Sequence, residues 1–437
     1  MSRVLIRRPV FLDRDRNAAF AITAIASSLF FLAYSGHFGK WTILAFYATW
    51  FPILFYNPQP YLAAPQRLLL LLVLPGVATL SMLWSQEPSA SLRHGIQFGT
   101  TVAAAAIAAR VISFENLAKG MIVGGVLIIL YSLYDGEYSY DVIDGSYAFA
   151  GAFESKNLLG WIAVLTMVPA VCLLTSRQRS RGWTLPSLAA IPLSVFILWI
   201  AQSTTAILIS AAAILVVLFL RASLRFAPLP RRILFFFSGC VLALGAYGLY
   251  SAGFFAEVLA IFGKDATLTG RTYLWNQAIK AGSEHSAFGW GYRAFWVHGQ
   301  PDAERLWHEF YIPNRSGFHF HNTILETYVE LGIAGAAIVI SLMLITIILA
   351  VRGALGRMQR DHATLYAAFG TALLIRSLVE VDFVTEYSLS TFLLTFFLLA
   401  SLDEQARAKR PRRAVRRGPA RAAAVPPGPP AGVRASR

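Results

Sequence analysis

The sequence predicts an all-α, polytopic integral membrane protein with about 12 transmembrane helices. Of its 437 residues, 56% are hydrophobic and only 14% are charged, whereas a soluble domain carries about 25% charged residues. Apolar runs of roughly 20 residues recur along the chain, and each is long enough to cross a bilayer as a helix. Two longer polar gaps interrupt this pattern, from Asp135 to Lys156 and from Ser251 to about Gly332.

The expected spans follow one another with short polar connections. Their starts lie near Ala18, Trp41, Arg67, His94, Leu117, Asn157, Thr184, Ser203, Ile233, Ile333, Ala363 and Tyr387. The basic first segment is expected to be an uncleaved anchor, because many further spans follow it. Cys172 and Cys240 both lie within apolar runs, so we expect neither a structural disulfide nor a metal site at these cysteines.

The distribution of Lys and Arg sets the expected orientation. Most of the 38 basic residues fall in alternate loops and in the tail, as the positive-inside rule requires of cytoplasmic segments. We therefore expect a cytoplasmic N-terminus at residues 1–17, a membrane domain at 18–402 and a disordered basic cytoplasmic tail at 403–437. The loop at 251–332 would face the periplasm. The net charge of +15 then reflects contact with membrane lipids and not with nucleic acid.

The large loop carries two patterned stretches. TGRTYLWNQAIKAGSEH, from Thr269, predicts an amphipathic helix lying on the membrane surface, with an apolar side made of Leu274, Trp275, Ala278 and Ile279. FGWGYRAFW, residues 288–296, is dense in aromatics that suit either the membrane interface or stacking on sugar rings.

Titratable residues gather at the start of the tenth expected span, in SGFHFHNTILETYVELGIAG, residues 316–335. The spacing predicts that His321 lies in the first helical turn, where the helix dipole favours a neutral imidazole able to act as a general base. Asn322, Glu326 and Glu330 would form a polar stripe beside it, and one of the glutamates would orient the imidazole. Spacing alone equally allows an interfacial histidine that holds the loop. His319 and His308 are expected to be bystanders.

Further polar residues are expected at the same membrane level. Arg271 opens the amphipathic helix, where it would bind phosphate or extend to lipid headgroups. Arg376 lies within a span, which favours a functional role over a structural pair with Glu380. Lys156 and Asn157, in FESKNLLG, are candidates for substrate binding or for ordinary helix capping.

The stretches TGRTYLWNQAI, FGWGYRAFW and HNTILETYVELGIAG together resemble the superfamily of O-antigen ligases and Wzy-type polysaccharide polymerases of bacterial inner membranes. The chain looks most like its ExoQ-type exopolysaccharide polymerases, to which FESKNLLG and LWSQEPSASLR are also similar. The superfamily's histidine, followed by ten residues and a glycine, matches His321 and Gly332, and its loop arginine matches Arg271. Many relatives carry a basic residue where QSTTA has Thr204 and Thr205.

The resemblance implies a helical bundle with an outward cavity that the large loop covers. It implies a donor in which an oligosaccharide is attached to undecaprenyl pyrophosphate, held by Arg271, Arg376, Lys156 and Asn157. It implies that His321 deprotonates the acceptor hydroxyl, with no metal or other cofactor. A chain-length regulator and a flippase are the protein partners that such a glycosyltransferase would have.

Two other functions compete with a polymerase. An O-antigen ligase would use the same donor but would move a finished chain to a lipid or protein acceptor. A polysaccharide flippase or transporter would show inverted repeats and interrupted helices near the bilayer midplane. The sequence has no convincing internal repeat, and its polar residues cluster at one membrane face, which favours an enzyme.

Overall fold

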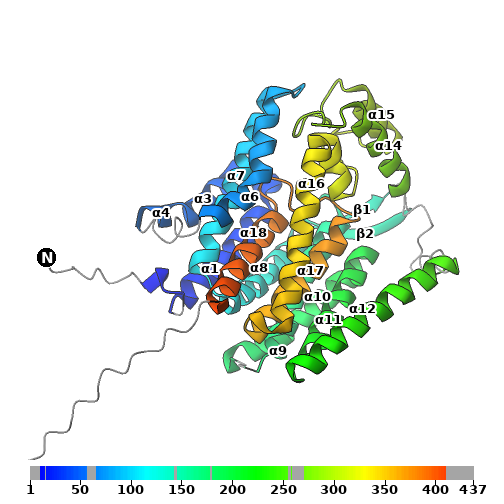
Figure 1. Ribbon diagram of the computed structural model, residues 1–437. Coiled ribbons are helices and arrows are strands. Elements are labelled where there is room, and N and C mark those ends of the chain that lie inside the picture. The colour runs from blue at the N-terminus through cyan, green and yellow to red at the C-terminus, as the bar shows by residue number, and fades with distance from the viewer. Residues whose placement is uncertain are drawn as a thin grey trace, which may run out of the picture.

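The computed structural model describes residues 10–14, 16–56, 65–141, 145–177, 180–253, 257 and 270–409. This part of the chain is helical apart from one hairpin, β1 (Glu137–Asp141) with β2 (Ser146–Gly151) (Figure 1). The α-helices are α1 (Ala18–Ala33), α2 (Ser35–Phe38), α3 (Lys40–Trp50), α4 (Pro52–Tyr56), α6 (Pro65–Leu80), α7 (Pro88–Val111), α8 (Phe114–Tyr134), α9 (Lys156–Leu174), α10 (Thr184–Ala201), α11 (Thr204–Ser223), α12 (Pro228–Ser251), α14 (Arg271–Glu284), α15 (Pro301–Glu309), α16 (Thr323–Arg352), α17 (Arg360–Ser377) and α18 (Leu389–Lys409).

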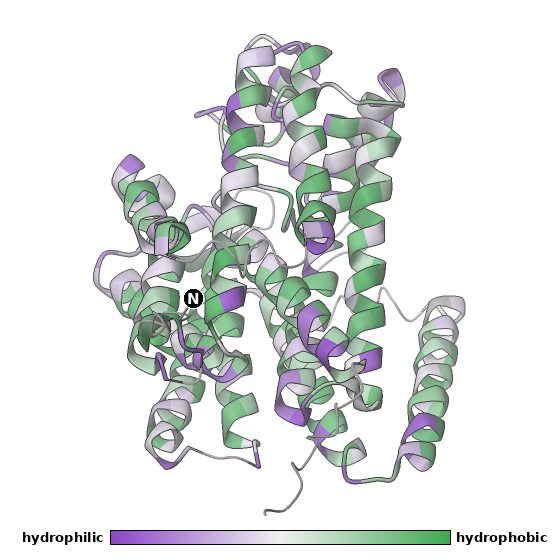
Figure 2. Cartoon of the chain, turned by 60° about the vertical axis from the view of Figure 1, so that its left-hand side comes forward, coloured by the Kyte–Doolittle hydropathy of each residue, from purple (hydrophilic) through white to green (hydrophobic). Residues whose placement is uncertain are grey.

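The predicted class, an all-α polytopic membrane protein, is confirmed. Every expected span start lies in or beside a helix, and hydrophobic residues cover most of the long helices (Figure 2). Among the described residues, 7 helical segments are long and apolar enough to cross a membrane; they contain α6, α8, α9, α10, α11, α12 and α16. The total of about 12 spans stays a prediction.

The last helix continues beyond the expected start of the tail at residue 403. Asp403, on α18, accepts hydrogen bonds from Arg67 and Arg110, and only 6% of its side chain is exposed. Gln405 donates to the carbonyl of Leu349 at 3.0 Å. These contacts hold the helix against the bundle as far as Gln405, and the helix itself continues to Lys409; the remainder of the predicted tail, 410–437, lies outside the described residues.

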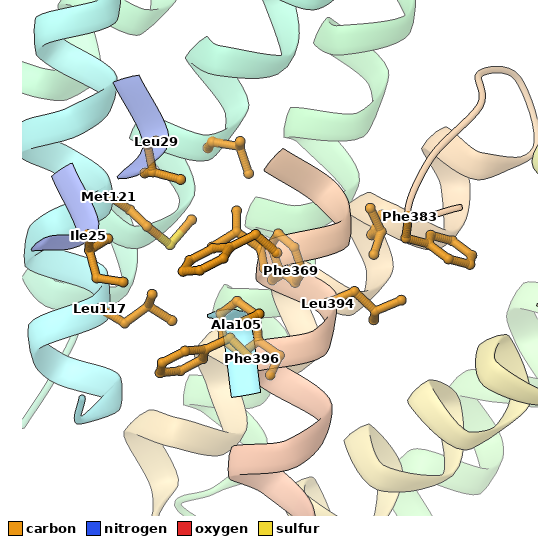
Figure 3. Close-up of a cluster of buried hydrophobic side chains, with 14 of the residues drawn as sticks. Ile25, Leu29, Ala105, Leu117, Met121, Phe369, Phe383, Leu394 and Phe396 are labelled. Carbon is orange, nitrogen blue, oxygen red and sulfur yellow. The ribbon is translucent and has the colours of Figure 1, made fainter. Parts of the chain in front are cut away.

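The main core fills the space between helices that are distant in sequence. Side chains from α1, α8, α17 and α18 point toward one another, among them Ile25, Met121, Phe369 and Phe396 (Figure 3). Small residues let α7 approach its neighbours closely, since Ala104 and its neighbours 105–109 are buried there. This core fixes the connector between α17 and α18, which carries the polar cluster described below.

The large loop has a core of its own. Leu274 and Ala278 of α14 pack with Trp307 of α15 and with Phe320 and Val329 beside and on α16. Protein therefore covers Leu274 and Ala278 of the expected apolar face of α14, whereas Ile279 on that face is 52% exposed. The expected contact of this helix with the membrane surface stays a prediction for the exposed part of the face. The aromatic stretch 288–296 is divided between packing and surface: Tyr292 and Phe295 are buried, whereas Phe288 is 58% exposed.

Helix α16 is broken at Gly332, and the loop preceding α15 locks into the break. Gly332 has φ 65° and ψ −163°, a conformation that essentially only glycine adopts. The carbonyls of Val329 and Glu330 accept from the backbone N–H groups of Trp290 and Gly291, each at 2.9 Å. A Cβ on Gly332 would lie 2.4 Å from the backbone of Ala287. The glycine of the histidine–glycine motif therefore allows the loop to cross the helix.

Candidate active site

One buried carboxylate collects side chains from separate parts of the fold. Glu380, in the α17–α18 connector, has 6% of its side chain exposed. Its Oε1 accepts from Arg271 Nη2 of α14 at 2.7 Å and from Asn157 Nδ2 of α9 at 2.9 Å. Its Oε2 lies 3.0 Å from Nδ1 of His321 and 3.9 Å from Nε2 of His319. Three predicted site residues thus meet at a fourth residue that the sequence had suggested only as a partner of Arg376.

His321 lies outside the helix, contrary to the expected first turn. The helix begins at Thr323, and Asn322 caps it by accepting from the N–H groups of Ile324 and Leu325. His321 has φ 50°, a left-handed conformation rare for a non-glycine residue. Its backbone N–H donates to Nδ1 of His319 at 3.1 Å, so the expectation that His319 is a bystander is wrong. His308 is exposed on α15.

Arg376, for which the sequence favoured a functional role over a pair with Glu380, forms an ion pair with Asp382. Its guanidinium donates to Asp382, and it lies 4.9 Å from the centre of the Trp161 ring. Both members of this ion pair are almost fully buried. The pair therefore anchors the connector just below Glu380, whose backbone N–H bonds to the carbonyl of Arg376 at 2.8 Å.

Glu326 and Glu330 do not orient the imidazole, contrary to expectation. Glu326 accepts from the indole N–H of Trp296 at 3.0 Å and from the backbone N–H of Phe320 at 2.7 Å. Glu330 accepts from the backbone N–H of Arg293 at 3.1 Å. Both are buried, so they tie the loop to α16 and support the histidine only indirectly. Sequence periodicity placed them correctly on one stripe but could not show which element covers that stripe.

The start of α9 joins the cluster through Asn157. Its side-chain oxygen accepts from Ser203, the N-cap of α11, at 2.9 Å, while its nitrogen donates to Glu380. Capping of α9 is done by Ser155, which accepts from the N–H of Asn157. Lys156 is half-buried at the first position of α9, beside this network. Asn157 thus has the site contact that FESKNLLG suggested.

The cluster keeps its carboxylate ionised and one imidazole neutral. Burial by itself raises the pKa of Glu380, but His321 and Arg271 outweigh it and hold that pKa well below its usual range. Burial lowers the pKa of His319 to about 3, and the neighbouring His321 adds to this effect. A neutral His319 suits the hydrogen bond that its Nδ1 accepts. The site therefore pairs a fixed negative charge with groups that donate to it.

His319, His321 and Glu380 also have the spacing of metal ligands. One ligand atom from each lies within 4.8 Å of the others. Arg271 already donates to this carboxylate at 2.7 Å and balances its charge, as a cation would. That no metal takes part in the reaction stays a prediction, which turnover in the presence of chelators would test.

A second carboxylate cluster lies in the same connector. The Glu386 carboxylate accepts hydrogen bonds from the guanidinium of Arg293 and from the hydroxyl of Tyr292 at 2.9 Å, and it lies 2.9 Å from Nδ1 of His94. Sequence reasoning missed Glu386 and Asp382. The sequence feature that could have revealed them is the run of acidic residues after Arg376, because carboxylates so close to apolar spans require buried partners.

A cavity of about 530 Å³ opens at the opposite end of the bundle. Cys172, Arg221 and Asp361 line it, at the ends of α9, α11 and α17 that lie away from Glu380. It is therefore separate from the cluster around Glu380.

The fold and the site define a class: a multi-pass helical membrane protein with a histidine, an arginine and a carboxylate assembled under one large loop. A model of the family described as O-antigen ligase matches residues 188–340, which include Arg271 and His321. The chain is 40% identical over 384 residues to the exopolysaccharide production protein ExoQ of Rhizobium meliloti (strain 1021), covering 87% of each chain. The chain belongs to this family of O-antigen ligases and ExoQ-type exopolysaccharide proteins.

Proposed function

We propose that this protein is a glycosyltransferase that polymerises oligosaccharides carried on undecaprenyl pyrophosphate, at the periplasmic face of the bacterial inner membrane. The observation that carries the proposal is the contact of Glu380 with both His321 and Arg271. A base and a phosphate-binding group are the two parts that glycosyl transfer from a pyrophosphate requires. Similarity to an exopolysaccharide production protein favours polymerisation.

In the proposed reaction, His321 acts through its free ring nitrogen. Nδ1–H donates to Glu380, which leaves the lone pair on Nε2 available. Nε2 takes the proton of the acceptor hydroxyl, whose oxygen bonds to the anomeric carbon of the donor. The bond between that carbon and the pyrophosphate oxygen breaks, and undecaprenyl pyrophosphate leaves with the electron pair. Glu380 orients the imidazole and stabilises its protonated form.

The leaving pyrophosphate needs positive charge, and Arg271 is the best placed to give it. About 14% of its side chain is exposed, and the nitrogens that do not bind Glu380 are available to phosphate oxygens. Lys156 and Asn157 add a charge and a donor from the start of α9. Arg376, buried against Asp382, contributes mainly by holding the connector in place. The matched O-antigen ligase family keeps one alternative open: transfer of a finished chain to a lipid or protein acceptor.

The test is turnover of a purified lipid-linked repeat unit by the full-length protein in lipid nanodiscs. A ladder of products that grows by one repeat unit is expected with the donor alone. If the donor is consumed only when a lipid A core or a protein acceptor is added, the protein is a ligase and not a polymerase. Labelling of single cysteines in intact cells, outside at Gly299 and not at Arg181, tests the orientation; the reverse pattern would contradict it.

A further inference from the structure

The hairpin that precedes the candidate site carries an exposed ladder of aromatic rings. The antiparallel register pairs Tyr138 with Phe149 and Tyr140 with Tyr147, so all of these side chains point to one face. Phe149 is buried, whereas the tyrosines are 52–62% exposed. The rings of Tyr138 and Tyr147 stack with their centres 5.2 Å apart and 16° between planes. The ladder is thus a preformed platform of ring faces.

The opposite face of the hairpin packs against the helical bundle. Ala148 and Ala150 of β2 are buried, and β2 packs against α9, α10 and α8. Because small residues face the bundle, the large rings have to face outward. The hairpin therefore packs against the membrane domain on one side, while on the other its tyrosines are more than half exposed and their ring contacts among the described residues lie within the hairpin.

The platform is continuous with the candidate site. Strand β2 leads within a few residues to Lys156 and Asn157, and Asn157 binds Glu380. Glu154, in that short connection, has its carboxylate beside Gly317, where an added Cβ would lie 2.6 Å from it. Gly317 is two residues before His319. The hairpin therefore leads into the segment that contacts both Glu380 and the stretch before His321.

The composition of the exposed surface separates this platform from the lipid-facing helices. The outlying helix α12 exposes Phe236, Leu242 and Leu244, which suit hydrocarbon (Figure 1). The hairpin instead exposes tyrosines, whose apolar rings and polar hydroxyls suit a surface that contacts both apolar groups and water. Pyranose rings carry apolar C–H faces and a rim of hydroxyls, so they complement both the ring faces and the phenol oxygens.

We propose that this tyrosine platform binds the growing glycan chain and holds it near the site during successive additions. The inference rests on the proposed function for the identity of the chain, since the glycan is the polymer that His321 would extend. Retention of the product lets the next addition occur before the chain diffuses away, and thus favours long polymers.

The test measures binding separately from turnover. Oligosaccharides released from the native host's exopolysaccharide are titrated by calorimetry into the full-length His321→Ala protein, which cannot turn over donor under the proposed mechanism. Adding Tyr140→Val and Tyr147→Val removes two rings while keeping strand propensity. We expect at least about tenfold weaker binding, or about 1.4 kcal/mol. Tyr140→Phe with Tyr147→Phe keeps the rings and should stay within about threefold.

Tyr134→Ala is the matched control, since Tyr134 is 88% exposed at the end of α8 and lies off the ladder. With His321 intact, the valine variant should make shorter chains while its rate for a single transfer is unchanged. Equal affinity of the valine variant and its parent for the oligosaccharide would overturn the inference. An equal loss of affinity in Tyr134→Ala would also overturn it, as would an affinity that changes with the lipid composition of the sample and not with the tyrosine substitutions. A wild-type protein that binds the oligosaccharide but does not polymerise the lipid-linked donor would instead contradict the proposed function alone.

Discussion

Replacing Glu380 by glutamine tests the candidate site most directly. Glu380 uses both oxygens: Oε1 accepts from Arg271 and Asn157, and Oε2 accepts from His321. Glutamine keeps the size but replaces one oxygen with an NH₂ group, which cannot accept. Arg271 and Asn157 can only donate at this contact, so they keep the remaining oxygen. The NH₂ group then faces Nδ1 of His321, which has to accept, and the proton moves to Nε2.

A proton on Nε2 blocks the proposed base. A positioned base contributes about 10²–10⁴-fold to rate, and the same tautomer error costs about 10⁴-fold in serine proteases. We therefore expect kcat of Glu380→Gln to fall by about 10²–10⁴-fold, which is about 3–5 kcal/mol of transition-state stabilisation. KM for the lipid-linked donor should change little, because Arg271 keeps its partner. The assay is turnover of purified lipid-linked repeat units at equal protein concentration.

Glu386→Gln is the matched control, since Glu386 is a carboxylate of the same connector that binds Arg293 and has only 10% of its side chain exposed. Its kcat should stay within about tenfold of wild type, because it does not contact His321. If Glu380 acts through His321, the double variant Glu380→Gln with His321→Ala should be no slower than His321→Ala alone. Wild-type turnover by Glu380→Gln, or fully additive losses, would refute the reasoning.

The remaining predictions concern other parts of the site and the fold. Arg271→Lys should raise KM for the donor about tenfold or more, because lysine loses the planar fork that binds phosphate; unchanged kinetics would leave Arg271 as a structural partner only. Gly332→Ala should destabilise the protein by at least about 2 kcal/mol in thermal unfolding, from backbone strain and the clash with the crossing loop; Gly76→Ala, with open space around it, should be neutral. Burial raises the pKa of Glu386, but Arg293 outweighs burial and lowers that pKa to about 2. The contribution of ionised Glu386 to stability is therefore complete above the usual pKa of about 4.3 and is lost as the pH falls through about 2. Between pH 7 and pH 2 the melting temperature should fall less in Glu386→Gln than in the wild type. Chelators should leave turnover unchanged, whereas a loss restored by a divalent cation would make the two histidines and the carboxylate its ligands.

Local sequence determined the class of the fold and the outline of the site. Long apolar runs require helices in a bilayer, because backbone groups have no other hydrogen-bond partners there, so the positions of the helices followed from hydropathy. Helical spacing drew attention to His321 and Arg271, and the family resemblance added the motif that joins His321 to Gly332 and matched Arg271 to the loop arginine. Asn157 was singled out because FESKNLLG places it at the start of an expected span, which is also a local signal.

Only the tertiary structure decided how these residues are used. Periodicity placed His321 in a helical turn, yet the fold holds it at φ 50° outside the helix, where His319 and Glu380 contact it. Charge spacing suggested a pair between Arg376 and Glu380, but the connector turns so that Asp382 meets the arginine instead. These contacts join segments up to 223 residues apart, as between Asn157 and Glu380. The free energy of burying a charge selects whichever partner the packed helices bring within reach, and a linear sequence does not contain that distance.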